Sequence, residues 1–73
     1  MVPLVISKRN GVAYIAGTGI PVWAIERCRR RGMQELVIRT RYPQLTEAQF
    51  QAAWTYAREN DEEIDEQIRE SQG

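Results

Sequence analysis

Hydrophobic residues occupy every second position in residues 2–7 and in residues 12–16. In each stretch they would therefore lie on one face of an extended chain. This two-residue period is typical of half-buried β-strands. Asn10-Gly11 lies between the stretches and suits the positive φ angles of a two-residue type I′ turn. We therefore predict a β-hairpin over residues 2–16. Pro3 cannot donate to a ladder, so the first strand is expected at a sheet edge that a second copy of the chain can pair with.

Further along, the hydrophobic spacing changes to three and four residues, which predicts helices over residues 21–31, 33–40 and from 46 to at least 58. Pro21 suits the first turn of the first of these helices, and Gly32 suits its end. Pro43 forbids continuation of the second helix. The Gly17-Thr18-Gly19 segment before the first helix is interpreted as a structural corner rather than a phosphate-binding loop, because two glycines lack the length of a P-loop.

The third helix has the strongest local signals. Thr46 is expected to cap it, Gln49 completes a capping box, and Leu45 is placed to pack against Phe50. The hydrophobic stripe of this helix consists of Phe50, Ala53, Trp54 and Ala57. The predicted fold is therefore mainly α with an N-terminal β-hairpin: a three-helix, homeodomain-like helix-turn-helix bundle. Three helices after a hairpin argue against the rival ribbon-helix-helix fold.

Charge divides the chain into two parts although its net charge is zero. Residues 1–58 carry nine basic and three acidic side chains, and residues 59–73 carry one basic and seven acidic ones. We therefore expect a hairpin plus helix-turn-helix domain over 1–58 and an acidic C-terminal tail over 59–73. Ile64 and Ile68 are the only apolar residues beyond Arg58. This stripe is narrow, so the tail is interpreted as a frayed or partner-binding helix.

Enzymatic chemistry is hard to place on this chain. Histidine is absent and Cys28 is the only cysteine, which removes the commonest general base, the Cys–His dyad and the usual zinc sites. We therefore expect no catalytic residue, no cofactor and no metal, and a solvated face for the tail carboxylates. A single cysteine, no apolar run long enough to cross a membrane and no signal-peptide pattern at the start favour the cytoplasm.

Arginines supply the most informative functional pattern. Six of them surround the predicted three-helix body and form a candidate phosphate-binding footprint: Arg27, Arg29, Arg30, Arg31, Arg39 and Arg41. A helix-turn-helix presents the N-terminal end of its third helix to the major groove. The candidate DNA-contacting residues at that end are Thr46, Glu47, Gln49 and Gln51. Glutamine can recognise adenine edges and glutamate can accept from cytosine. The alternative role for the arginines is solubility and helix-end capping.

Between Ala16 and Ala57 the chain resembles a bacterial and archaeal family long catalogued as a domain of unknown function. The residues that carry the resemblance are Gly17-Thr18-Gly19-Ile20-Pro21-Val22, Gly32-Met33, Tyr42-Pro43-Gln44-Leu45-Thr46-Glu47, Ala52-Ala53 and Tyr56-Ala57. The family pattern is GTRIPV, a glycine before the second helix, YP-x-LT-x-E and A-A-L-x-Y-A. This chain has Gly19 where the family commonly has arginine. The family is regarded as a group of helix-turn-helix, VapB-like antitoxins, often encoded beside PIN-like ribonuclease toxins.

The resemblance implies two partners. A homodimer would bind operator DNA through its basic body and repress its own operon, while the tail would dock on a PIN-like ribonuclease toxin with Ile64 and Ile68 as apolar anchors. Either Arg69 reaches the catalytic carboxylates of the toxin, or the acidic residues cover a basic RNA-binding surface. The alternative function is a protein-interaction or dimerisation module without DNA binding, which the zero net charge and Gly19 favour.

Overall fold

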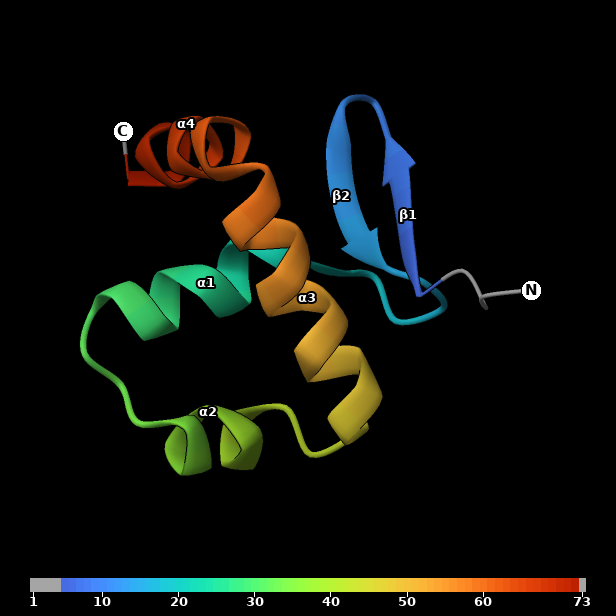
Figure 1. Cartoon of the computed structure of the whole chain (residues 1–73), viewed down its shortest axis with the longest axis vertical. Helices are drawn as coiled ribbons and strands as arrows, with labels where there is room; N and C mark the ends of the chain where they lie inside the picture. Colours follow the sequence, from blue (N-terminus) through green and yellow to red (C-terminus); the bar gives the residue numbers. More distant parts are fainter. Residues whose placement is uncertain (1–4, 73) are drawn as a thin grey trace.

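A three-stranded antiparallel sheet followed by four helices makes up the computed structural model, which describes residues 5–72 (Figure 1). The elements are β1 (Ile6–Arg9), β2 (Val12–Ile15), β3 (Ile20–Pro21), α1 (Val22–Arg30), α2 (Glu35–Arg41), α3 (Glu47–Glu59) and α4 (Asp61–Gln72). Val2, Pro3 and Leu4, which were expected to begin the first strand, lie outside the described residues.

The hairpin turn lies where the sequence predicts it. β1 and β2 pair antiparallel with Arg9 opposite Val12, so Asn10 and Gly11 form the two-residue connection. Both residues have positive φ angles, 53° for Asn10 and 79° for Gly11, as a type I′ turn requires. The predicted turn is confirmed.

The predicted corner at Gly17-Thr18-Gly19 is followed by a third strand that was not predicted. The Thr18 hydroxyl donates to the Ile15 carbonyl at 2.7 Å and accepts from the Ile20 N–H at 3.1 Å, which fixes the turn after β2. The chain then runs extended through Ile20 and Pro21, and Tyr14 lies opposite Pro21 in the ladder. The sheet order is therefore β1-β2-β3, with β1 and β3 at the edges.

Helix boundaries fall close to the predicted ones. Pro21 occupies the N-cap position of α1 in an extended conformation, and the helix ends before Gly32, whose φ of 84° is left-handed. At α3 the predicted capping box is confirmed. The Gln49 N–H donates to the Thr46 hydroxyl at 3.2 Å, and the Thr46 N–H donates to the Gln49 side-chain oxygen at 2.7 Å.

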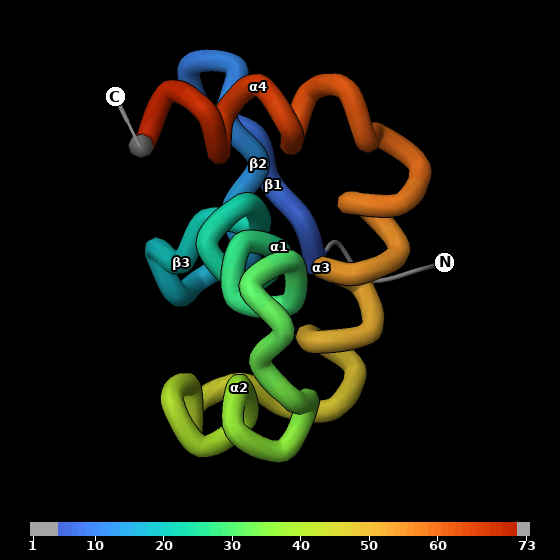
Figure 2. The backbone as a smooth tube through the Cα atoms, turned by 90° about the vertical axis from the view of Figure 1, so that its left-hand side faces the viewer, coloured from blue at the N-terminus to red at the C-terminus, as the bar shows by residue number. Residues whose placement is uncertain are grey.

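Helix α1 lies at the centre of the molecule. It contacts α2, α3, α4 and the sheet, and in Figure 2 it is seen nearly end-on, with α4 on one side and α2 on the other. The buried hydrophobic core draws on every helix and on β2: Ala13, Ile15, Val22, Ile25, Cys28, Ile38, Leu45, Phe50, Ala53, Ala57, Ile64 and Ile68.

The predicted three-helix helix-turn-helix bundle is wrong. β3 adds a strand to the hairpin, and α4 adds a fourth helix to the bundle. The physical reason is that Ile64 and Ile68, four residues apart on one face of α4, are 0% and 6% exposed and complete the core beside α1. The result is a small α/β domain in which residues 61–72 form the last packed helix.

Candidate nucleic-acid interface

Two of the predicted DNA-binding arginines are held by a buried carboxylate within α1. Glu26 is only 3% exposed, and it accepts from Arg29 at 2.6 and 2.8 Å and from Arg30 at 3.1 Å. Burial raises the pKa of Glu26, but the hydrogen bonds and charges of the two guanidinium groups outweigh it and leave the pKa below its usual value of 4.5. Arg29 and Arg30 therefore serve the fold of α1.

Arg30 also joins α1 to the acidic segment. Its guanidinium donates to Asp61 at 3.0 Å and to Asp65 at 2.9 Å, both on α4. A single arginine thus has three carboxylate partners, counting Glu26. The sequence separates a basic body from an acidic tail. In the structure, Arg30 of the body and two carboxylates of the tail neutralise one another.

The residues expected to contact bases are largely engaged within the protein. Glu47 is bound by Arg39, with Nη2 and Oε1 at 2.9 Å, and it also accepts from the Gln51 side chain at 3.2 Å. Thr46 and Gln49 form the capping box of α3. Glu35 approaches Arg39 at 3.5 Å from the start of α2. These contacts orient α2 against the N-terminal end of α3.

Three of the predicted arginines have no carboxylate partner in the described part of the chain. Arg27, Arg31 and Arg41 form no ion pair within residues 5–72. Arg27 and Arg31 are one turn apart on α1, and Arg41 ends α2. Tyr42 lies near two of them: burial raises the pKa of its hydroxyl, while the charges of Arg27 and Arg41 oppose the rise. We call Arg27, Arg31, Arg41 and Tyr42 the basic face.

An aromatic contact positions Arg27, one member of the basic face. The Arg27 guanidinium lies over the Trp23 ring at 5.3 Å from its centroid, a cation–π geometry. The buried Nε of Arg27 has no hydrogen-bond partner among the described residues. Arg31 and Arg41 are exposed. Exposed guanidinium groups without an acidic partner suit electrostatic contact with phosphate oxygens.

The predicted toxin anchors do not lie on the surface. Ile64 and Ile68 are in the core, so α4 would have to leave α1 before either could touch a partner. Arg69 is exposed and lies 3.3 Å from Asp65. Glu62, Glu66 and Glu70 follow one another at four-residue spacing along α4 and are all exposed, and the last two also line a cleft beside the hairpin turn. We call these three residues the outer acidic face.

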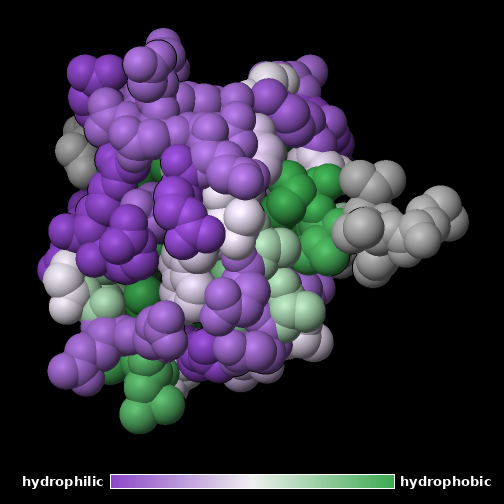
Figure 3. All heavy atoms as spheres, in the orientation of Figure 1, coloured by the Kyte–Doolittle hydropathy of each residue, from purple (hydrophilic) through white to green (hydrophobic). Residues whose placement is uncertain are grey.

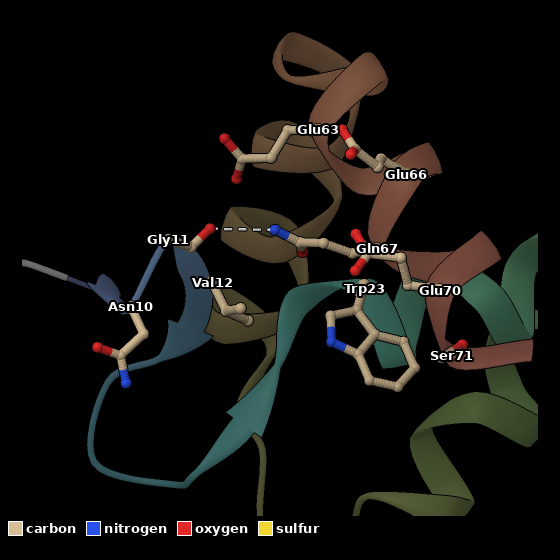
Figure 4. Close-up of a pocket in the computed structure, with 9 residues that line it drawn as sticks. All are labelled: Asn10, Gly11, Val12, Trp23, Glu63, Glu66, Gln67, Glu70 and Ser71. Carbon is tan, nitrogen blue, oxygen red and sulfur yellow. Dashed lines mark hydrogen bonds between the residues drawn. The ribbon is translucent and has the colours of Figure 1, made fainter. Parts of the chain in front are cut away.

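A shallow cleft separates the hairpin turn from α4 (Figure 4). Its lining residues are Asn10, Gly11, Val12, Trp23, Glu63, Glu66, Gln67, Glu70 and Ser71. The Gln67 amide donates to the Gly11 carbonyl at 3.1 Å across the cleft, and the Ser71 hydroxyl donates to the Ile68 carbonyl at 2.7 Å. Glu63 accepts from Tyr56 at 2.7 Å and from Lys8 at 3.1 Å. The Gln67–Gly11 and Lys8–Glu63 contacts tie the hairpin to α4, and the Tyr56–Glu63 contact ties α3 to α4.

One surface feature was missed in the sequence. Leu36 and Val37, whose helical spacing with Met33 predicts that they face the core, are 75% and 44% exposed. Ile38 is buried instead. In a helix of seven residues the hydrophobic run Leu36-Val37-Ile38 fits more than one inward face, so spacing alone does not select the buried one.

Across residues 5–72, no cluster of three or more histidine, cysteine, aspartate and glutamate side chains is arranged to hold a metal ion. None of the described helices combines the length and the hydrophobicity needed to cross a membrane.

Comparison with known proteins identifies relatives. Residues 7–57 match the model of a family described as "Protein of unknown function (DUF433)". A solved structure of a DUF433 member protein from Anabaena variabilis ATCC 29413 is 36% identical to this chain, with a TM-score of 0.80. The alignment covers 89% of this chain and 68% of that one. No curated protein matches the chain.

Proposed function

Because the chain belongs to the DUF433 family, whose function its name leaves open, we propose that it is a VapB-like antitoxin. It binds operator DNA in the cytoplasm and represses its own operon, and it also binds a PIN-like ribonuclease toxin. One observation carries the DNA-binding part of this proposal. Arg27, Arg31 and Arg41 have no acidic partner in the described structure, and two of them lie near Tyr42.

The basic face supports binding to the phosphate backbone. Arginine forms bidentate contacts with phosphate oxygens and keeps its charge at every physiological pH. Arg29, Arg30 and Arg39, the other three arginines of the predicted footprint, are neutralised by Glu26, Asp61, Asp65 and Glu47. DNA binding by this chain therefore depends on three guanidinium groups rather than six, and does not require a helix-turn-helix.

Binding to a duplex from the region upstream of its own gene, measured across a salt series, tests this part. The slope of log K against log salt is about −0.9 per phosphate contacted. The double variant Arg31→Ala/Arg41→Ala is expected to weaken binding and to reduce the slope by about 1.8 in magnitude. Arg9→Ala/Arg58→Ala is the matched control, since it removes two arginines that also lack an ion pair in the described structure but lie on β1 and α3. Equal effects of the two double variants would contradict the assignment.

Toxin binding is assigned to the outer acidic face. Glu62, Glu66 and Glu70 are exposed along one side of α4, and their carboxylates complement the basic RNA-binding surface that a ribonuclease presents. Ile64 and Ile68 hold α4 in place rather than contacting the toxin. We expect Glu62→Lys/Glu66→Lys to abolish capture of a PIN-like ribonuclease while the thermal unfolding temperature is kept. Undiminished capture by this variant would exclude the outer acidic face.

The second candidate is a protein-interaction module without DNA affinity. The observation that favours it is the adjacent pair Leu36 and Val37, 75% and 44% exposed, because two neighbouring apolar side chains on α2 offer a hydrophobic contact surface to a partner. The salt series separates the two candidates. A module of this kind gives no salt-dependent affinity for duplex DNA, and Leu36→Asp would remove its partner binding.

A further inference from the structure

The cleft between the hairpin turn and α4 combines an apolar surface with an acidic one. Val12 of β2 and Trp23 of α1 supply the apolar part, and two glutamates of α4 supply carboxylates. Figure 4 shows the Trp23 ring and the side chains of Glu66 and Glu70 bordering the same space. The volume of the cleft is about 520 Å³, within the range of sites that bind small ligands. One long side chain of a partner fits such a space.

The carboxylates on the helix side of the cleft are not neutralised within the domain. Glu66 and Glu70 are exposed, lie one helical turn apart and form no ion pair in the described part of the chain. Glu63, the third carboxylate of the cleft, is already bound by Lys8. In Figure 3 the surface over α4, at the upper left, is hydrophilic. Cβ atoms one turn apart are separated by about 5–6 Å, so one cationic group can reach both free carboxylates.

An unpartnered acceptor makes the same demand on a ligand. The Gln67 side chain crosses the cleft and donates to the Gly11 carbonyl. The side-chain oxygen of Gln67 is buried, and it accepts no hydrogen bond from the described residues. A buried acceptor without a donor is unfavourable. The lining therefore offers acceptors in excess, and the ligand that satisfies them is one with several N–H donors and a positive charge.

We propose that this cleft binds the side chain of an arginine that a protein partner presents. Arginine has an apolar stem and a planar, charged head with five N–H donors. The stem would pack on Val12 and Trp23, and the head would donate to Glu66, Glu70 and Gln67. Lysine fits less well, because its three donors share one nitrogen and it has no planar face to stack on an indole ring.

Trp23 already accepts one guanidinium group. Arg27 lies over its ring at 5.3 Å from the centroid, but Arg27 is not among the residues that line the cleft. The free carboxylates therefore remain open to a second guanidinium group. The inference deepens the proposed toxin binding, and the identity of the partner rests on that proposal. The binding of an arginine side chain is testable without any ribonuclease.

Proton–nitrogen correlation NMR of the full chain tests the cleft directly. The probe is a capped glycine–serine peptide that carries one arginine, and the control peptide carries citrulline, the uncharged isostere of arginine. The chain has two tryptophans, so each indole N–H gives its own signal. We expect the Trp23 signal to move at millimolar peptide, while the signal of Trp54, which stacks on Phe50 in α3, stays in place. The citrulline peptide is expected to bind at least about threefold more weakly, because it lacks the charge.

Two double variants separate the cleft from acidic surface in general. Glu66→Gln/Glu70→Gln removes both free carboxylates of the cleft and is expected to raise the Kd of the arginine peptide at least about threefold. Glu59→Gln/Glu62→Gln is the matched control, since it removes two exposed carboxylates that form no ion pair in the described structure and do not line the cleft. It is expected to leave the Kd nearly unchanged. The dispersion of the amide signals verifies that each variant is folded.

Three results would overturn the proposal: a Trp23 signal that does not move, equal affinity for the two peptides, and an equal loss of affinity in the two double variants. Failure of this inference and failure of the proposed function are distinguishable. If the peptide does not bind while a PIN-like ribonuclease is still captured, the arginine site is wrong and the toxin assignment stands. If the peptide binds as expected and no ribonuclease is captured, the arginine site stands and the toxin assignment fails.

Discussion

Replacing Ile64 by alanine tests whether α4 is part of the domain or a separate tail. The Ile64 side chain is 0% exposed, and it lies in a core that includes residues of α1, α3 and the sheet. The substitution removes three carbon atoms from that core and leaves a cavity. It keeps the helix propensity of α4 at least as high as before.

The expected magnitude follows from the burial. Truncating a fully buried isoleucine to alanine costs about 2–5 kcal/mol. A domain of 73 residues has a free energy of unfolding of about 4–11 kcal/mol at the usual range per residue. Ile64→Ala therefore removes a large share of the total. At about 4–8 °C per kcal/mol for a domain of this size, the melting temperature should fall by at least about 8 °C.

Thermal unfolding followed by circular dichroism measures this change, with Glu62→Ala as the control on the exposed side of the same helix. Glu62 has no ion pair in the described structure, so its replacement should change the free energy of unfolding by no more than about 0.5 kcal/mol. If both variants melted like the wild type, α4 would not be docked. Residues 59–73 would then be the independent tail that their composition suggests.

Three further variants test individual contacts. Thr46→Ala removes the capping box of α3 and should lower the free energy of unfolding by about 1 kcal/mol in a denaturant titration. Gly32→Ala forces a side chain into a left-handed φ of 84° and should cost about 1 kcal/mol by the same measurement. Because the folded-state pKa of Glu26 is lowered by Arg29 and Arg30, its contribution is present above pH 4.5 and is lost as the pH falls through the folded pKa. Glu26→Gln should therefore flatten the acid side of the stability profile, and an unchanged profile would assign the pH dependence to other groups.

Features encoded by neighbouring residues could be predicted from the sequence. The Asn10-Gly11 turn and the Thr46 capping box both depend on side chains within four positions of one another, and both occur as expected. The same holds for the end of α1 before Gly32, where the backbone must take a left-handed φ that glycine adopts without strain.

Features that depend on distant partners were not predictable in the same way. Ile20 and Pro21 become a strand only because Tyr14 and Ile15 offer a free edge of β2. Ile64 looks isolated among acidic residues, and its stabilising neighbours come from elements far away in the chain. A two-residue apolar stripe that would be marginal alone is sufficient when α1 already supplies a hydrophobic surface.

The arginine pattern also depends on contacts that the sequence does not show. Counting arginines treats every guanidinium group as free, but Arg30 has three carboxylate partners and Arg39 has two. Glu26 and Glu35 are close enough in sequence for their pairing to be foreseen, since they are three or four residues from their partners. Asp61 and Asp65 are more than thirty residues from Arg30, and only the packing of α4 brings them to it.

The contacts between the hairpin and α4 determine when folding can be completed during synthesis on the ribosome. Lys8 and Glu63 are 55 residues apart, and Gln67 and Gly11 are 56 apart. At translation rates of about 5–20 residues per second, the hairpin is made about 3–11 s before its helical partner emerges. During that interval the nascent chain exposes the hydrophobic surface that Ile64 and Ile68 later cover. The final compaction step therefore waits until α4 has left the ribosome, and nascent chains arrested before residue 60 should be bound by chaperones.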